Sequence, residues 1–290
     1  MSIHVLKQIR SAVSNLNPEQ VQKSADQPLA VGLVATNPEG YEAMENFLIP
    51  ASVSEQKRKE LKQILHRAGD PGVPSRFDLV LYERQIPVAA NAFTFYAEKP
   101  SQTIADILGE RQELGLVLAK NFPAFRRPVI NGIIQTISKE NALFALATAL
   151  PNIVPSLVEL PWAVGEFASD TAVITMNQIR MAFLIAAASD SEIGYREQKS
   201  ELASIVAGAF GWRAVARELI GKIPFGAGLI PKGAVAYAGT YVVGLSLERY
   251  QRLGYGLART ERRAAYDEAI KHGKGVAKVL LAGLKRVDAA

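Results

Sequence analysis

The pattern of apolar and polar positions divides the chain into a strand-like first part and a helix-like second part. In the first part, the apolar run PLAVGLVA is followed by the turn signal TNPEG and then by apolar positions at helical spacing. This order predicts a strand, a loop and a helix. The runs FDLVLYE and VAANAFTFYA predict two further strands. We therefore expect a small α/β unit over residues 28–100.

Polar segments precede and interrupt this unit. Residues 1–27 predict a short amphipathic helix followed by a polar linker. Residues 57–66, KRKELKQILH, predict a charged helix. The N-terminus has no apolar core of signal-peptide length, so we expect a protein that is not secreted.

The second part, residues 101–290, follows helical spacing and contains long apolar passages. The first of these, NALFALATALPNIVPSLVEL, approaches the roughly 20 apolar residues that cross a bilayer. Pro151 and Pro155 bend or end a helix there, so two short helices or one kinked helix are expected. The expected fold class therefore lies between α+β and α/β, with a small N-terminal α/β unit followed by a larger, all-helical and apolar region.

Arg180 lies in the middle of a second apolar passage, DTAVITMNQIRMAFLIAAAS. An arginine that faces lipid at the centre of a bilayer costs about 2.5 to 3.5 kcal/mol on insertion scales. We therefore expect a buried amphipathic helix in which Arg180 binds backbone carbonyls or a carboxylate such as Glu166 or Glu218.

A third passage, from Gly221 to Leu247, is apolar but is interrupted by prolines and lysines. Its uncharged part is shorter than the roughly 20 residues that a single span needs. We therefore expect half of a helical hairpin, whose small residues pack against a neighbouring helix in lipid or in water. The turn is expected at Pro224 and Pro231, the water or headgroup side at Lys222 and Lys232, and close helix packing at Gly233 and Gly239.

The segment VATNPEGYEAMENFL has the outline of a phosphate-binding loop but lacks its chemistry. Gly40 follows an apolar strand, but Tyr41 stands where such a loop has its lysine and Glu42 where it has its magnesium-binding hydroxyl. A carboxylate at that place would repel phosphate by several kcal/mol at about 4 Å. Two explanations remain open: a GTPase-derived unit that has lost its ligand, or a generic strand, turn and helix. Both predict no nucleotide hydrolysis.

The composition narrows the chemistry further. The chain of 290 residues carries a net charge of +5, three histidines and no cysteine. The absence of cysteine excludes a disulfide framework, a thiolate nucleophile and a cysteine-based zinc site. The three histidines lie far apart in the sequence and lack the spacing of metal ligands.

Carboxylates near the predicted strand ends form no catalytic set. Asp78, Glu83 and Glu98 have no partner histidine and no ligand motif, so we expect them to be solvated residues at the edge of the sheet. We therefore predict a protein that is not an enzyme and that holds no cofactor and no metal.

The basic excess is concentrated after Glu248, and the chain ends in a basic amphipathic pattern. Such a helix commonly lies on an anionic membrane, at about 1 kcal/mol per basic residue near the surface. Docking on an acidic partner and packing as a solvated helix also fit. Nucleic acid is not expected as a partner, because tyrosines are not interleaved with the basic residues in a binding motif. The basic residues around the apolar stripe are Lys274, Lys278, Lys285 and Arg286.

The passage GWRAVARELIGKIPFGAGLIPKGAVAYAGTYVVG, with the preceding NQIRMAFLIAAA, resembles the helical region of the bacterial YcjF-like family. The resemblance covers about the C-terminal half of the chain. It rests on Arg180 before the alanine-rich helix end, on the charged helix after Trp212, on the turn around Pro224, and on the AYAGT block. That family is a domain of unknown function often attached to a GTPase domain. The resemblance implies association with a membrane through two hydrophobic segments and no established reaction.

Three hypotheses for function follow. The favoured one is a non-enzymatic adaptor or scaffold on the cytoplasmic side of a membrane, held peripherally or by an embedded hairpin. Its partners would be an anionic membrane and a protein or a second copy of the chain. The second hypothesis is a soluble helical scaffold subunit of a larger assembly, and the third is a nucleotide switch related to GTPases.

Overall fold

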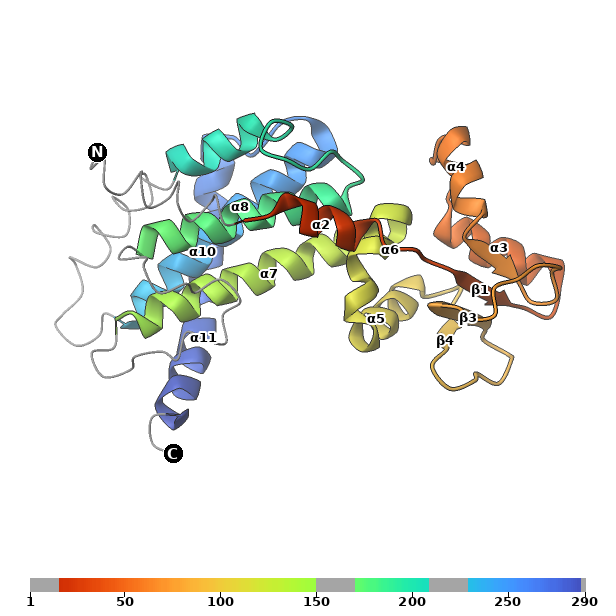
Figure 1. Cartoon of the computed structure of the whole chain (residues 1–290). Helices are drawn as coiled ribbons and strands as arrows, with labels where there is room; N and C mark the ends of the chain where they lie inside the picture. The colour runs from red at the N-terminus through yellow and green to blue at the C-terminus, as the bar shows by residue number, and fades with distance from the viewer. Residues whose placement is uncertain (1–15, 150–169, 209–228, 288–290) are drawn as a thin grey trace. The chain divides into compact units, whose positions relative to one another are not determined.

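The computed structural model describes residues 16–149, 170–208 and 229–287 (Figure 1). The chain forms two compact units. The sheet unit comprises Gln22–Ile130 together with Ala187–Asp190, and the helical unit comprises the rest of the described chain. The elements are mostly helices, with a small parallel sheet, so a mostly helical α+β class is confirmed.

The sheet of the first unit has four parallel strands in the order β2-β1-β3-β4. The central strands are β1 (Val31–Val34) and β3 (Leu79–Glu83), and the outer strands are β2 (Leu65–Arg67) and β4 (Phe93–Phe95). The strands predicted from three apolar runs are therefore confirmed as β1, β3 and β4. Because all four run in one direction, their carboxyl ends lie along one edge of the sheet.

Strand β2 was not predicted, and the helix expected over residues 57–66 is shorter than its pattern. Helix α4 is Glu55–Lys62, capped by the Ser54 hydroxyl, which accepts a hydrogen bond from the Lys57 amide at 3.3 Å. The chain then pairs with β1, with Leu65 opposite Val31. The free edge of β1 provides backbone partners that compete with helix continuation, because buried backbone groups must be paired.

The other helices of this part of the chain lie before, between and after the strands, and α3 and α5 pack against β1 and β4. The sheet-facing side of α3 includes Met44 and Leu48, both fully buried. Phe47 lies 5.3 Å from Phe95 and 6.2 Å from Phe125, measured between ring centroids. The elements are α2 (Pro18–Ala25), α3 (Pro38–Leu48), α5 (Pro100–Glu110), a 3-10 turn at Gln112–Leu114, α6 (Gly115–Asn121) and the start of α7 (Pro123–Ala147).

The segment expected as a linker contains a helix. Asn17 begins α2 by accepting the amide of Glu19 on its side chain at 2.8 Å, which is a normal helix cap. The amphipathic helix expected at the start of the chain lies outside the described residues.

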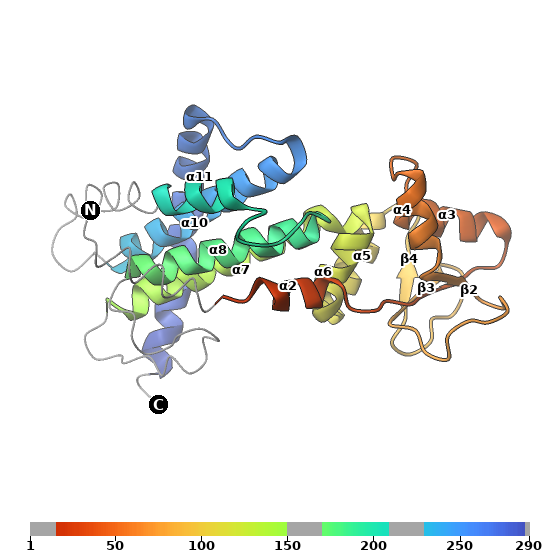
Figure 2. The same cartoon turned by 45° about the horizontal axis from the view of Figure 1, so that its top comes forward.

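The helical unit packs α7, α8 (Asp170–Ala188), α10 (Leu229–Leu253) and α11 (Arg259–Val287), together with helical residues 199–208 (Figures 1 and 2). A hairpin is present, formed by α10 and α11. Its turn lies at Gly254, whose φ of 79° suits glycine, and Glu261 caps α11 by accepting the Ala258 amide at 2.8 Å. Of the two prolines at which a hairpin turn was expected, Pro231 lies in the first turn of α10, where a missing amide is tolerated. Pro224 lies outside the described residues.

Small residues let α10 approach its neighbours closely, as the sequence predicts. A Cβ on Gly233 would lie 2.9 Å from Leu146 Cγ and 3.1 Å from the Cβ of Ala277. Gly239 is buried within the same helix. The helix that lies against the AYAGT block is α11, where Ala238 and Val242 pack with Tyr266 and Ala269.

Buried polar side chains connect three helices of this unit. Asn141 of α7 donates to the Thr240 hydroxyl of α10 at 2.8 Å, and Asn177 of α8 donates to the Asn141 carbonyl oxygen at 2.7 Å. The Gln178 amide also donates to Thr240, at 3.4 Å. All four side chains are at most 2% exposed. Each bond satisfies a group that would cost about 1 to 3 kcal/mol if it were buried without a partner.

Helix α8 alone among the described helices is long and apolar enough to cross a membrane, over Thr171–Ala188 with a mean hydropathy of 1.3. Of this window, 83% is buried inside the structure. A core helix of a protein in water passes the same test of length and composition. The expected buried helix around Arg180 is confirmed.

The close approach of α10 and α11 predicts opposite effects for two glycines of α11. A Cβ on Gly273 would lie 3.0 Å from the backbone oxygen of Ala234, so Gly273→Ala must separate the helices and should lower the free energy of unfolding by about 1 to 3 kcal/mol. Gly275 has open space around it, so Gly275→Ala should raise that free energy by about 0.5 to 1 kcal/mol through helix propensity. Urea unfolding followed by circular dichroism measures both. Equal effects of the two substitutions would contradict the packing.

Candidate functional site

The carboxyl edge of the sheet, between β1 and β3, is the place where open α/β sheets bind ligands. The strand order reverses there, because β1 connects to β2 on one side while the chain continues with β3 on the other. Loops leaving the two strands diverge at such a point and leave a crevice. The loop after β1, which contains Thr36 and Asn37 and leads into α3, is the loop with the outline of a phosphate-binding loop.

A carboxylate from the chain itself lies at this edge. Glu83, the last residue of β3, accepts hydrogen bonds from the backbone amide of Thr36 at 2.8 Å and from the Thr36 hydroxyl at 2.7 Å. These two bonds, the amide first, hold the pKa of the Glu83 carboxyl below its usual range. The carboxylate of Glu83 therefore occupies a position at the start of α3 that suits an anion.

A second amide of the loop, that of Gly40, is also used internally. The Asn37 side chain accepts the Gly40 amide at 2.8 Å, and Pro38 has no amide hydrogen. A Cβ on Gly40 would lie 2.9 Å from the Cβ of Ala35 and 3.0 Å from the Glu83 carboxylate. Glycine at this position therefore makes room for Glu83, a different use from wrapping a phosphate.

Tyr41 and Glu42, the two residues that depart from a phosphate-binding loop, have different surroundings. The Tyr41 ring lies 5.3 Å from the guanidinium carbon of Arg67, which also forms an ion pair with Glu45 at 2.6 Å. The hydrogen bond to Glu45 raises the pKa of Arg67. Glu42 is exposed on α3. The carboxylate at the loop is thus Glu83, whereas the sequence pattern had pointed to Glu42.

Two of the three carboxylates that were expected to be solvated at strand ends also make specific hydrogen bonds. Glu83 caps the loop after β1, and Asp78 accepts the Ala30 amide at 2.8 Å where β1 and β3 begin. Glu98 is exposed and lies 3.6 Å from Arg84. The one signal in the sequence for Glu83 was its place at the carboxyl end of a strand, since its partner Thr36 is 47 residues away.

A second candidate site lies in the helical unit, where α7 ends, α10 begins and the second half of α11 passes. Lys232 donates to the Thr148 hydroxyl at 3.3 Å, and Gly233 contacts Leu146 and Ala277. Lys274 and Lys278 are exposed on α11. We call Lys232, Lys274 and Lys278 the basic end of the helical unit. The last turns of α11 project past α7 and α10 in both views (Figures 1 and 2).

The apolar stripe of α11 is buried to different degrees along the helix. Ala277 is fully buried, whereas Leu280, Leu281 and Leu284 are half-buried. Val279, on the other face, is 73% exposed. The basic end therefore combines lysines with apolar side chains that the unit covers only in part.

Arg180 has a structural place outside both sites. Its guanidinium donates to the carboxylate of Glu140 on α7. Burial lowers the pKa of Arg180 and raises that of Glu140, since burial disfavours both charged forms, and the pairing offsets part of this. A carboxylate partner was expected, and Glu140 is one. The two carboxylates named for this role, Glu166 and Glu218, lie outside the described residues.

Three predicted contact residues cannot be placed in a site. Lys222 lies outside the described residues, and the side chains of Lys285 and Arg286 at the end of α11 are likewise not described. Within the described part of the chain, no three histidine, aspartate or glutamate residues are grouped so that they could hold a metal ion.

The Glu83 contact predicts a specific pH dependence. A carboxyl whose pKa is lowered in the folded state stabilises that state above its unfolded pKa, and this contribution is lost as the pH falls through the folded pKa. The Thr36 amide proton shift, measured by NMR, should therefore titrate with a midpoint below that of an ordinary glutamate. Glu83→Gln should abolish this titration and Glu42→Gln should leave it unchanged. A midpoint in the ordinary glutamate range would refute the contact.

Comparison with known proteins finds no relative of this chain. No family model matches the chain, and no curated protein and no solved structure matches it either. The resemblance to the YcjF-like family therefore stays a prediction, and the function has to be argued from the two sites.

Proposed function

We propose that the protein is a non-enzymatic adaptor that attaches to an anionic membrane surface through the basic end of its helical unit. The observation that carries this proposal is the exposure of Lys274 and Lys278 on the second half of α11, shortly before apolar side chains that are only half covered. A helix of this kind gains about 1 kcal/mol per basic residue near an anionic surface. The attachment is weak and sensitive to salt.

Peripheral attachment is preferred to an embedded hairpin because the most apolar helix is already covered. Of the window Thr171–Ala188 in α8, 83% is buried, and the side chains of Asn177 and Gln178 donate hydrogen bonds inside the unit. A helix whose apolar surface and amide groups are satisfied by protein has little to gain from lipid. We place the membrane on the cytoplasmic side, in line with the expectation that the protein is not secreted.

The sheet unit is proposed as an α/β head without a nucleotide, which precedes a larger helical body along the chain. Glu83 at the start of α3 supports this, since a phosphate would have to displace a carboxylate held by two hydrogen bonds. The head would meet a protein partner or a second copy of the chain. Descent from a GTPase and membership of the YcjF-like family are part of the same proposal.

A second candidate function is a soluble helical scaffold subunit of a larger assembly. It is favoured by the polar cluster of Asn141, Asn177, Gln178 and Thr240, which makes the helical unit self-sufficient. In this alternative, the basic end contacts an acidic protein surface. A nucleotide switch is the least supported, because the Thr36 and Gly40 amides of the loop already bind carboxylate and side-chain oxygens of the chain itself.

Sedimentation with vesicles separates these candidates. The full chain should pellet with vesicles of phosphatidylcholine and phosphatidylserine at low salt. High salt alone should release it, without alkali or detergent. Lys274→Gln/Lys278→Gln should weaken binding about 25-fold, since each lysine contributes about 1 kcal/mol. The matched control Lys59→Gln/Lys62→Gln changes two exposed lysines of α4 and should leave binding unchanged.

Three other results would point elsewhere. Binding that survives alkaline washing indicates an embedded hairpin. Absence of binding to any anionic vesicle supports the soluble scaffold. Equal loss in both double variants shows that net charge, and not the basic end, is responsible.

A further inference from the structure

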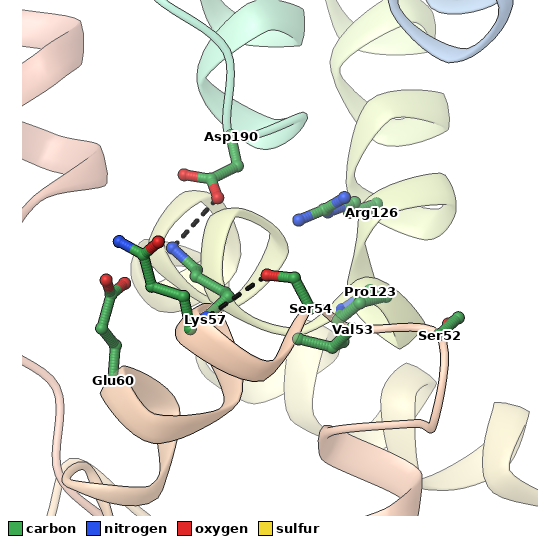
Figure 3. Close-up of a pocket in the computed structure, with 9 residues that line it drawn as sticks. Ser52, Val53, Ser54, Lys57, Glu60, Pro123, Arg126 and Asp190 are labelled. Atoms are coloured by element: carbon green, nitrogen blue, oxygen red, sulfur yellow. Dashed lines mark hydrogen bonds and ion pairs between the residues drawn. The ribbon is translucent and has the colours of Figure 1, made fainter.

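A polar cavity of about 550 Å³ lies between α4 and the first turns of α7, and no function has been assigned to it above (Figure 3). All the residues that line it belong to the sheet unit. Its volume is within the range of sites for small molecules, roughly 300 to 1,000 Å³. The lining is dominated by polar side chains, which suits a small charged ligand. The residues that matter to the argument are Ser52, Ser54, Lys57, Glu60, Arg126 and Asp190.

Arg126 is held in place and still offers a donor to the cavity. Its Nε donates to the Ala119 carbonyl at 3.2 Å and its Nη2 to the Lys120 carbonyl at 3.3 Å. Within the described part of the chain, its Nη1 has no hydrogen-bond partner. Figure 3 shows the guanidinium directed into the cavity, toward Lys57 and Asp190. A guanidinium oriented in advance loses little entropy when it binds an oxyanion.

Lys57 and Ser54 lie opposite Arg126. The Lys57 ammonium forms an ion pair with Asp190 at 3.0 Å, and both side chains remain about a quarter exposed, at 26% and 28%. The Ser54 oxygen accepts the Lys57 amide, so its own hydroxyl hydrogen is available as a donor. Two cationic groups and one hydroxyl therefore converge on the same space from two helices.

Asp190 is an unusual residue for its position. It follows the end of α8 with a φ of 58°, in the left-handed region where helix ends prefer glycine or asparagine. A carboxylate at the end of a helix is also unfavourable, because that end is the negative pole of the helix dipole. Its ion pair with Lys57 is the compensating interaction in the structure. The Asp190 carboxylate is therefore the anion that pairs with the Lys57 ammonium in this structure.

We propose that the cavity binds a phosphate monoester whose oxygens take the place of the Asp190 carboxylate. Lys57 and Arg126 Nη1 neutralise the phosphate, and the Ser54 hydroxyl donates to it. Glu60 lies one turn along α4 from Lys57, so the cavity holds a second carboxylate that opposes further negative charge. That limits the ligand to one phosphate group and disfavours di- and triphosphates. The proposal does not rest on membrane attachment.

The test uses the full chain and glycerol 3-phosphate, followed by isothermal titration calorimetry. Lys57→Gln should weaken binding about tenfold or more, since it removes a charge-assisted hydrogen bond. Arg126→Gln should do the same. The matched controls Lys59→Gln and Arg127→Gln alter exposed neighbours on the same helices and should leave the affinity unchanged.

Asp190→Asn gives the sharpest result, because it should act in the opposite direction. It releases Lys57 and places a residue that favours the left-handed conformation, so phosphate affinity should rise while the melting temperature stays the same or increases. A gain of affinity in this variant cannot be explained by unfolding, whereas a loss of affinity in Lys57→Gln or Arg126→Gln could be. The proposal is overturned if glycerol 3-phosphate does not bind at millimolar concentration and vesicles with phosphatidic acid show no Lys57-dependent binding either. An unchanged or lowered affinity in Asp190→Asn for whichever phosphate monoester binds also overturns it.

Two sources of the phosphate monoester are separated by a second measurement. Vesicles with and without phosphatidic acid present the same group on a lipid. Binding to these vesicles that depends on Lys57, with no binding of glycerol 3-phosphate, assigns the site to a lipid headgroup, and the reverse assigns it to a free metabolite. Each of these results supports the site, whereas dependence on Lys274 and Lys278 alone assigns the vesicle binding to the basic end and counts against it.

Discussion

The hydrogen bond from the buried Asn141 amide to the Thr240 hydroxyl is the contact on which the arrangement of the helical unit depends. It joins α7 to α10, and through Asn177 the same amide joins both to α8. These groups can be satisfied in one relative placement of three helices, because hydrogen bonds require specific distances and directions. An apolar core alone would tolerate sliding of one helix along another. The polar cluster therefore determines which face of α10 lies toward α7 and α8.

Two carboxylates of the sheet unit each pair with donors of the chain itself. Glu83 accepts a hydrogen bond from the Thr36 amide in the loop after β1, and Asp190 forms an ion pair with Lys57 in the cavity beside α4. The two cases differ in their surroundings. The loop after β1 offers Glu83 one backbone amide and one hydroxyl and no lysine, whereas the cavity combines Lys57 with Arg126 and Ser54. A phosphate that enters the cavity therefore finds positive charge to pair with, whereas at the loop it finds none. For this reason we treat Glu83 as a structural carboxylate and Asp190 as the one that the proposed ligand replaces.

Much of the local structure could be predicted from the sequence. Alternating and continuous apolar runs indicated β1, β3 and β4, and the small residues around the AYAGT block indicated close helix packing. Strand β2 was not predicted because KRKELKQILH has helical spacing up to His66. Only pairing with β1 makes its last residues a strand. The lack of a lysine and a hydroxyl at Tyr41 and Glu42 is visible in the sequence, and the expectation that this loop does not bind phosphate stays a prediction. The residue that fills the place, Glu83, was not recognised.

The sequence by itself determined the mostly helical α+β class, the lack of cysteine chemistry and the position of the basic residues at the end of the chain. Tertiary structure alone decided that Arg180 pairs with Glu140, that Thr36 pairs with Glu83, and that Lys57 and Arg126 face one cavity. Local patterns depend on residues a few positions apart, because helices and strands repeat over 3.6 and 2 residues. Charge pairs and cavities join residues that are tens of positions apart, and only the packing of whole elements brings them together.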